Sequence, residues 1–355
     1  MIKFFFPQDK KIFKEIVFLS YPVVLSNISR VLMSIFDVAM VGRLGSEALA
    51  ATGMGGMLVW APMSMALGIR TAVQTVSSRR LGQKKEEESS RAFHNGLIMA
   101  TVFAFPVTLI GWAYADQIVP LFLEDQTTIV LAVEYTSIVF ISLLFSVYSF
   151  VFVGFYTGVE KTKIHMTVTI VSNTINLYLN AALIYGSEGI DLFFREVLPS
   201  LSFLKVAWEW TYFPAMGVKG AAFATLVASV WMAAHYGFYL FSKEIKARFN
   251  IFSFSFNKEM MHKQLQLAIP MGVQECIIAF GWTFFLKVVG IIGVVELATT
   301  HIIFTIMHAS FMPAMGIGMA CSTLVSKYMG ENKTHKSVSS IKESVRLAEY
   351  GMGTL

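Results

Sequence analysis

A single carboxylate lies near the end of the first long apolar stretch. Asp37 occurs in SIFDVAMVGRLG, about one and a half helical turns before a glycine-containing turn. A desolvated carboxylate gains proton affinity and can also hold a metal cation, so the two occupants compete. Asp37 is therefore predicted to couple H⁺ or Na⁺ to another process. A structural role stays open, because Arg30 lies seven residues earlier on the same helical face and could be neutralised by Asp37 or tune it.

Three amide side chains follow one face of a later apolar segment. Asn173, Asn176 and Asn180 stand at positions i, i+3 and i+7 of IVSNTINLYLNAALIYG. Such amides bond to neighbouring helices inside a membrane. Two readings follow from the spacing: the amides hold the bundle together, or they complete the Asp37 site.

A second carboxylate lies in another apolar stretch. Glu275 follows Pro270 by five residues and is predicted to be an ion site or a member of a structural pair. Lys287 is expected to extend towards a membrane surface. His301 and His308 share one helical face. They are either members of a proton relay or histidines packed in the core.

The composition places these residues in a membrane protein. The 355 residues are 55% hydrophobic and 14% charged, and the mean hydropathy is +0.62. Runs of about 20 apolar residues follow one another, as membrane-spanning helices require. Segment 97–114 is apolar on every face, which excludes the alternating pattern of a β-barrel. We predict an all-α polytopic membrane protein with Cys276 and Cys321 as unpaired core residues.

The apolar runs and the basic residues together predict a topology. Twenty of the 28 Lys and Arg residues fall in loops on one side and four on the other, which places the amino terminus in the cytoplasm. Segment 187–215 is expected to form a helix on the outer membrane surface or, alternatively, a lid over a ligand. The predicted spans are 16–40, 48–74, 93–115, 129–155, 164–186, 216–241, 264–289 and 297–325, with a ninth from near 338.

The sequence repeats itself at a spacing of 248 residues. Six spans separate equivalent points, so the two copies are expected to enter the membrane in the same direction, related by an axis along the membrane normal. Glu275 occupies the repeat position of Asn27. The matched positions include Pro22 with Pro270, Gly42 with Gly290, Gly45 with Gly293, and Gly82 with Gly330.

The repeat predicts three parts. They are an N-terminal six-helix bundle at 1–241, a cytoplasmic linker at 242–263 and a partial C-terminal bundle at 264–355. Nothing corresponds to 108–241 in the second copy, so we expect a truncated protein that would be a monomer at full length.

The sequence lacks the motifs that are typical of other classes of function. The chain has no GxxxxGK[ST], HExxH or GxSxG, which argues against an ATPase or another enzyme and for an ion gradient as the energy source. A pI near 9.0 suggests nucleic-acid binding, but the basic residues lie in short loops, where orientation explains them. No cofactor and no nucleic acid are expected, only a coupling ion and membrane lipid.

Several motifs together resemble the multidrug and toxic compound extrusion (MATE) family. They are Pro22 followed by Asp37 and MVGRLG, then ALAATG, GIRTAVQTVSSRRLGQKK, the amide series ending in LIYG, and GVKGAAFATLVAS. The resemblance implies two six-helix bundles in a V. It also implies export of organic cations or drugs across the inner cell membrane in exchange for H⁺ or Na⁺, with Asp37 in cation coupling.

The resemblance leaves two points open. Many relatives carry an acid where this chain has Asn180, which leaves the identity of the coupling ion open. A flippase for lipids or lipid-linked oligosaccharides, from the same superfamily, is the alternative. It would need a cationic cavity, for which Arg30, Arg70 and Lys287 are the candidates.

Overall fold

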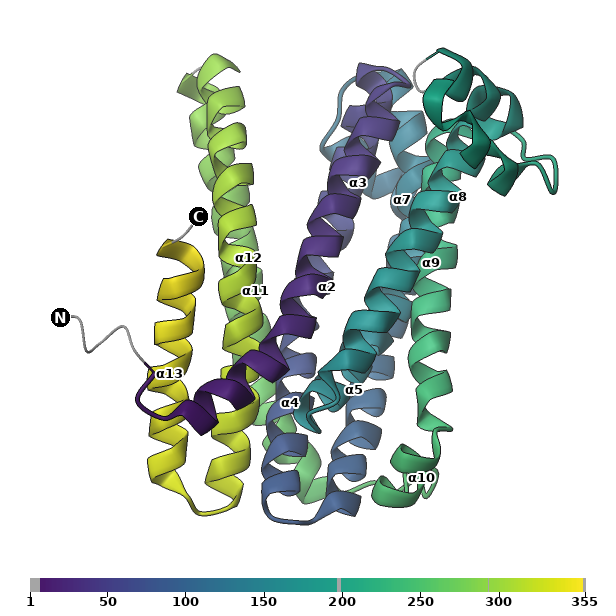
Figure 1. The fold of residues 1–355 in the computed structure, drawn as a ribbon. Helices are drawn as coiled ribbons and strands as arrows, with labels where there is room; N and C mark the ends of the chain where they lie inside the picture. Colours follow the sequence, from purple (N-terminus) through teal and green to yellow (C-terminus); the bar gives the residue numbers. More distant parts are fainter. Residues whose placement is uncertain (1–6, 197–198, 293, 354–355) are drawn as a thin grey trace.

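A computed structural model describes residues 7–196, 199–292 and 294–353, and within these ranges the secondary structure is helical, with no β-strand. Seven of the helical segments described are long and apolar enough to cross a membrane, the last of them Lys258–Trp282. The helices, labelled as in Figure 1, are α2 (Lys10–Gly42), α3 (Ser46–Met65), α4 (Leu67–Gly82), α5 (Glu86–Ala113), α6 (Ala115–Ile118), η1 (Val119–Leu121), α7 (Gln126–Gly158), α8 (Thr162–Glu196), η2 (Pro199–Trp208), α9 (Gly217–Leu240), α10 (Lys243–Phe249), α11 (Lys258–Ile292), α12 (Val294–Gly330) and α13 (Thr334–Gly353).

The helices extend past most of the predicted spans. The segment predicted as 48–74 runs on to Gly82 and is divided at Ala66 into α3 and α4. Pro62 removes one backbone donor from α3. The Ala66 amide then bonds to the Met63 carbonyl at 3.1 Å, an i to i−3 bond that tightens the end of the helix. The hydropathy pattern does not report this division.

The predicted repeat is present in the backbone. Helices α2 and α11 start at Lys10 and Lys258, and α5 and α13 start at Glu86 and Thr334, so the start positions in each pair differ by 248. The turns before α5 and α13 match as well. Lys84 and Asn332, also 248 apart, both have positive φ angles, 59° and 58°. The same turn is thus built twice.

The two copies touch through reciprocal glycine contacts. A Cβ built on Gly82 would lie 2.0 Å from the Lys327 carbonyl oxygen, and one built on Gly330 would lie 2.2 Å from the Arg79 carbonyl oxygen. Lys327 is the repeat partner of Arg79, so each contact is the image of the other. Two-fold symmetry about an axis between the copies explains this exchange, as expected for parallel repeats.

These contacts lie at one end of the molecule, which we call the basic end because the turns around Lys84 and Lys333 are there. Figure 1 shows α12 beside α2 at the basic end and far from it at the opposite end. The helices of the two copies therefore form the arms of a V.

The first turns of α2 pack against the second copy. Ile12 and Ile16 are buried in a cluster with Ile317 and Leu324 of α12. Both figures that show the whole chain place this part of α2 across α12 and α13. The Glu343 carboxylate of α13 accepts hydrogen bonds from the backbone amides of Gln8 and Asp9, just before α2, at 3.1 and 3.2 Å. Helix α2 thus connects both copies.

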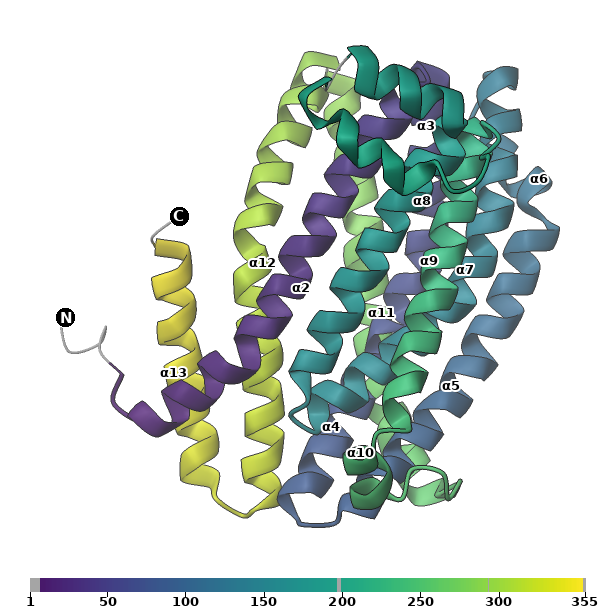
Figure 2. The same cartoon turned by 45° about the vertical axis from the view of Figure 1, so that its right-hand side comes forward.

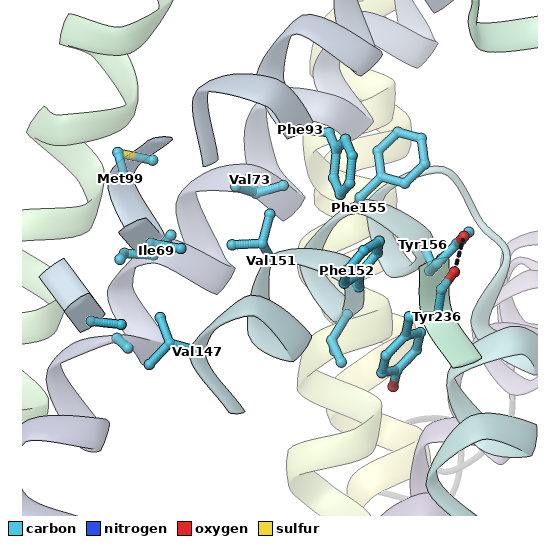
Figure 3. Close-up of a cluster of buried hydrophobic side chains, with 14 of the residues drawn as sticks. Ile69, Val73, Phe93, Met99, Val147, Val151, Phe152, Phe155, Tyr156 and Tyr236 are labelled. Carbon is cyan, nitrogen blue, oxygen red and sulfur yellow. Dashed lines mark hydrogen bonds between the residues drawn. The ribbon is translucent and has the colours of Figure 1, made fainter. Parts of the chain in front are cut away.

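The largest buried cluster lies inside the first copy (Figure 3). Phe152 and Phe155 of α7 pack on Phe93 of α5 with ring centroids 5.2 and 5.0 Å apart. The Tyr156 hydroxyl donates to the Tyr236 carbonyl of α9 at 2.9 Å, which satisfies a buried polar group. Helix α7 is therefore the centre around which α4, α5 and α9 pack.

Ion pairs join the loops at the basic end. Arg248 of α10 contacts Glu86 at 2.7 Å, and Lys327 contacts Glu160 at 2.6 Å. The hydrogen bond from Lys161 holds the pKa of the Glu244 carboxyl below its ordinary value. Ion pairs at least partly open to solvent contribute little to stability individually. Their positions nevertheless show that α10, within the predicted linker, lies against the first copy.

The glycine contacts predict a stability difference. Gly82→Ala would place a methyl group against the Lys327 backbone, so we expect the free energy of unfolding to fall by about 1–3 kcal/mol. Gly53→Ala is the matched control, because a Cβ there meets nothing within 4 Å and removing a helical glycine stabilises by roughly 0.5–1 kcal/mol. Thermal unfolding in detergent measures both. Equal midpoints for the two variants would contradict the reciprocal contact.

Candidate functional site

Helices α2 and α8 lie side by side and run in the same direction (Figures 1 and 2). Three hydrogen bonds join them in order along their length. The Asn173 amide donates to the Ser29 hydroxyl at 2.9 Å, the Asn180 amide donates to the Asp37 carboxylate, and the Tyr185 hydroxyl donates to the Met40 carbonyl at 2.6 Å. The polar face of α8 therefore points at α2.

The centre of this interface is a network of one carboxylate and two amides. The Asn180 Nδ2 group donates to Asp37 Oδ1 and also to Asn176 Oδ1 at 3.2 Å, so both of its hydrogens are used. Asn180 and Asn176 are only 2% and 7% exposed. Asp37 itself is half-buried. The carboxylate is thus held by a neutral amide inside a membrane span.

The network leaves oxygen acceptors without partners among the described residues. Asn180 Oδ1 is buried and accepts no hydrogen bond. Only Oδ1 of the Asp37 carboxylate is bonded to Asn180, so its second oxygen is available. Carboxylate and amide oxygens are suitable ligands for hard cations, and a protonated carboxyl could donate to the free amide oxygen. The chemistry fits either a proton or a small cation.

Helix α7 contributes a tyrosine to the surroundings of Asp37. Tyr135 interacts electrostatically with Asp37. Its ring lies against Gly55 of α3, where a Cβ would come within 2.6 Å of the Tyr135 ring. The close approach of α3 thus keeps the tyrosine beside the carboxylate.

The carboxyl-terminal part of α8 is fixed by the segment that follows it. Gly186 has a φ angle of 68°, a left-handed conformation that ends the regular helix. Beyond this bend, the Ser187 amide bonds to the Phe213 carbonyl at 3.0 Å. The Trp208 ring of η2 stacks on Tyr178 of α8 with centroids 5.1 Å apart. The described parts of segment 187–215 are therefore folded onto the helix that carries the amides.

Two of the predicted residues lie apart from this network. Arg30 makes no ion pair with Asp37, and its charge interacts instead with Arg70, His165 and Tyr236. Glu275 of α11 interacts electrostatically with Arg70. No hydrogen bond between the described residues joins Glu275 to the Asp37 network. The structure thus joins Asp37, Asn176 and Asn180 directly and separates Arg30 and Glu275 from them.

Three residues of the site were missed by sequence reasoning. Ser29 and Asp37 are eight residues apart and share a helical face, a spacing that could have indicated Ser29. Tyr185 and Tyr135 carry no such signal, since aromatic residues occur throughout the spans. Their positions depend on which helices pack together.

Three further candidates lie in helical segments: Lys287, His301 and His308. Their side chains lie outside the described residues. Among the side chains that are described, no group of three or more His, Cys, Asp or Glu residues could hold a metal ion. The half-buried Cys276 and Cys321 are free thiols.

The first copy and the second copy both match one family model. The MatE model matches residues 22–182 and 270–348, and the two matches begin at Pro22 and Pro270, 248 residues apart. Together they cover more than half of the chain.

Curated relatives from bacteria are described as multidrug resistance proteins. A probable multidrug resistance protein NorM from Thermotoga maritima is 24% identical over 94% of this chain and 68% of its own length. A probable multidrug resistance protein NorM from Bacillus cereus is 27% identical over 73% of this chain. The multidrug resistance protein NorM of Burkholderia vietnamiensis is 24% identical over 88% of this chain. The chain spans 53% and 62% of the length of the Bacillus and Burkholderia proteins.

Solved structures share the fold. The outward-facing conformation of a multidrug resistance MATE family transporter superimposes with a TM-score of 0.81 at 21% identity, covering 96% of this chain and 70% of that one. A MOP superfamily transporter from Pyrococcus furiosus superimposes with a TM-score of 0.82 at 21% identity, with the same coverage of both chains. With the family matched in both copies of the repeat and the helices arranged as in these transporters, the chain belongs to the MatE family of multi-span membrane transporters.

Proposed function

We propose that this protein acts in secondary active efflux, exporting organic cations or drugs in exchange for H⁺ or Na⁺. The single observation that supports the proposal best is the Asp37 carboxylate, held by Asn180 inside a membrane span. It lies within the first MatE match, and the curated relatives are described as multidrug resistance proteins.

The site suggests how the coupling works. Asp37 can hold a proton, a sodium ion or the positive charge of a substrate, but one carboxylate cannot serve two of them at full strength. Binding of the coupling ion would therefore weaken binding of the organic cation, and the reverse holds to the same extent. Asn173, Asn176 and Asn180 would keep the carboxylate aligned while its occupant changes.

The proposal includes the setting of the protein. We place it in the bacterial inner membrane with a cytoplasmic amino terminus, because the basic loops gather at one end of the bundle. Residues 1–241 would form one transport bundle, 242–263 the linker and 264–355 the part of the second bundle in this chain. Small cationic or amphipathic compounds would be the substrates, and no catalytic step is proposed.

Transport is the direct test of the function. Cells that express the protein should accumulate less of a fluorescent organic cation than cells with an empty vector, and collapsing the proton and sodium gradients should abolish the difference. Fluorescence per cell over time measures both effects. Equal accumulation across several cationic dyes would count against efflux.

Asp37→Asn separates a coupling role from a structural one. The variant keeps the shape and hydrogen bonding of the site but removes its charge, so the affinity for tetraphenylphosphonium should fall about tenfold or more, a loss of about 1.4 kcal/mol per tenfold. The remaining binding should no longer depend on pH or Na⁺. Equilibrium binding to the purified protein measures the affinity.

The control for this variant is Glu47→Gln, which neutralises an exposed carboxylate in the first turn of α3. It should bind the cation as the unchanged protein does. A folded Asp37→Asn protein with undiminished, ion-dependent binding would remove Asp37 from the mechanism.

Asn180→Ala tests the amide that holds the carboxylate. Removing Nδ2 leaves the Asp37 carboxylate without its donor, so the free energy of unfolding should fall by about 1 kcal/mol or more. Thr174→Ala is the matched control, since the exposed Thr174 hydroxyl on the same helix bonds only to the Ile170 carbonyl behind it. Thermal unfolding compares the stability of the two variants. Equal stability would argue against the hydrogen-bond network at Asp37.

A further inference from the structure

Two arginines in the membrane spans have no anion in contact with them. Arg30 lies on α2 and Arg70 on α4, and they interact electrostatically with each other. Neither makes an ion pair within 4.0 Å with any side chain that the structure describes. The Arg70 Nε atom is buried and has no hydrogen-bond partner. A donor buried in this way costs free energy unless a ligand or water satisfies it.

The surrounding helices do not supply the missing negative charge. His165 of α8 interacts electrostatically with both arginines, and Tyr236 of α9 interacts with Arg30. Their mutual hydrogen bond, 2.7 Å between His165 Nδ1 and the Tyr236 hydroxyl, joins two groups without negative charge. Towards α11, the Glu275 carboxylate interacts electrostatically with Arg70 but forms no ion pair with it within 4.0 Å. Among the described residues, Glu275 is thus the one carboxylate that interacts with Arg70, and it forms no ion pair with either arginine.

The main chain fixes where these cations stand. The Arg70 carbonyl packs against α7, where a Cβ on Gly154 would lie 2.4 Å away. Arg30 lies about 10 Å along α2 from Asp37, given 1.5 Å per residue over seven residues. The Arg30 side chain is exposed although its charge interacts with groups on α4, α8 and α9. A soluble or lipid ligand can therefore reach it.

Isolated cations inside a membrane are costly, and the planar guanidinium group fits carboxylate and phosphate oxygens in pairs. We infer that Arg30 and Arg70 form a binding site for a ligand that carries a carboxylate or phosphate group, distinct from the cation site at Asp37. Binding by this pair does not require transport. That such a ligand is exported rests on the proposed function.

A pair of matched fluorescent probes tests the site. Dansyl-6-aminohexanoate and dansylcadaverine share a fluorophore and a similar linker but end in a carboxylate and an ammonium group, respectively. Their binding is measured by dansyl fluorescence with the full chain in nanodiscs of phosphatidylcholine. Arg30→Gln and Arg70→Gln should each weaken binding of the carboxylate probe about tenfold or more, since a charged hydrogen bond is lost. Binding of the ammonium probe should not weaken.

Control variants keep the result interpretable. Lys219→Gln removes an exposed cation of α9, 3.9 Å from Glu134, and should bind both probes normally. Arg70→Lys keeps the charge and should retain part of the affinity if Arg70→Gln does not fold. Arg30 is exposed, so its substitution is expected to fold. The inference would be overturned if two folded proteins bound the carboxylate probe as the unchanged protein does: the single variant Arg30→Gln and the double variant that combines Arg30→Gln with Arg70→Lys.

Competition identifies the source of the anionic group. Displacement of the carboxylate probe by phosphatidylglycerol in the nanodisc, lost in Arg30→Gln, indicates a lipid headgroup. Displacement by inorganic phosphate, lost in the same variant, indicates a soluble anion. Asp37→Asn separates the two proposals: if it leaves ammonium-probe binding unchanged while the arginine variants lose the carboxylate probe, the cation-coupling proposal fails and the anion site stands.

Discussion

Direct contact between backbones at the basic end holds the two copies of the repeat together. Gly82 against the Lys327 carbonyl and Gly330 against the Arg79 carbonyl leave no room for a side chain at either position. Close approach through small residues is the usual way for membrane helices to pack, because lipid provides no hydrophobic driving force between them. The arms can therefore diverge at the other end while the molecule remains one body (Figure 1).

Helix α2 depends on this contact at one end and on α8 along its length. Its first turns pack on Ile317 and Leu324 of the second copy, while Ser29, Asp37 and Met40 bond to α8. A change in how the copies meet would be transmitted through α2 to the carboxylate. The position of Asp37 on this helix is suited to linking ion binding with movement of the arms.

Charge is distributed unevenly along α2. Asp37 is held by the neutral amide of Asn180. Arg30, two turns away, interacts electrostatically with Arg70, and no anionic side chain that the structure describes forms an ion pair with it. In a low-dielectric setting such neighbours would normally pair, because an uncompensated charge is expensive. Their separation leaves each charge available for a ligand of the opposite sign, and this is the physical basis of both proposals.

The sequence alone determined the helices, the repeat and the candidates on each helix. Apolar runs of sufficient length specify spans, matched glycines specify a repeated backbone, and the spacing of Asn173, Asn176 and Asn180 specifies one face. Periodicity describes a helix about its own axis, and it contains no information about which helix stands opposite. Tertiary structure therefore decided that Asn180, not Arg30, bonds to Asp37, and that Glu275 interacts electrostatically with Arg70. It also decided the role of Tyr185, since a hydroxyl finds the Met40 carbonyl only when α2 and α8 are packed together.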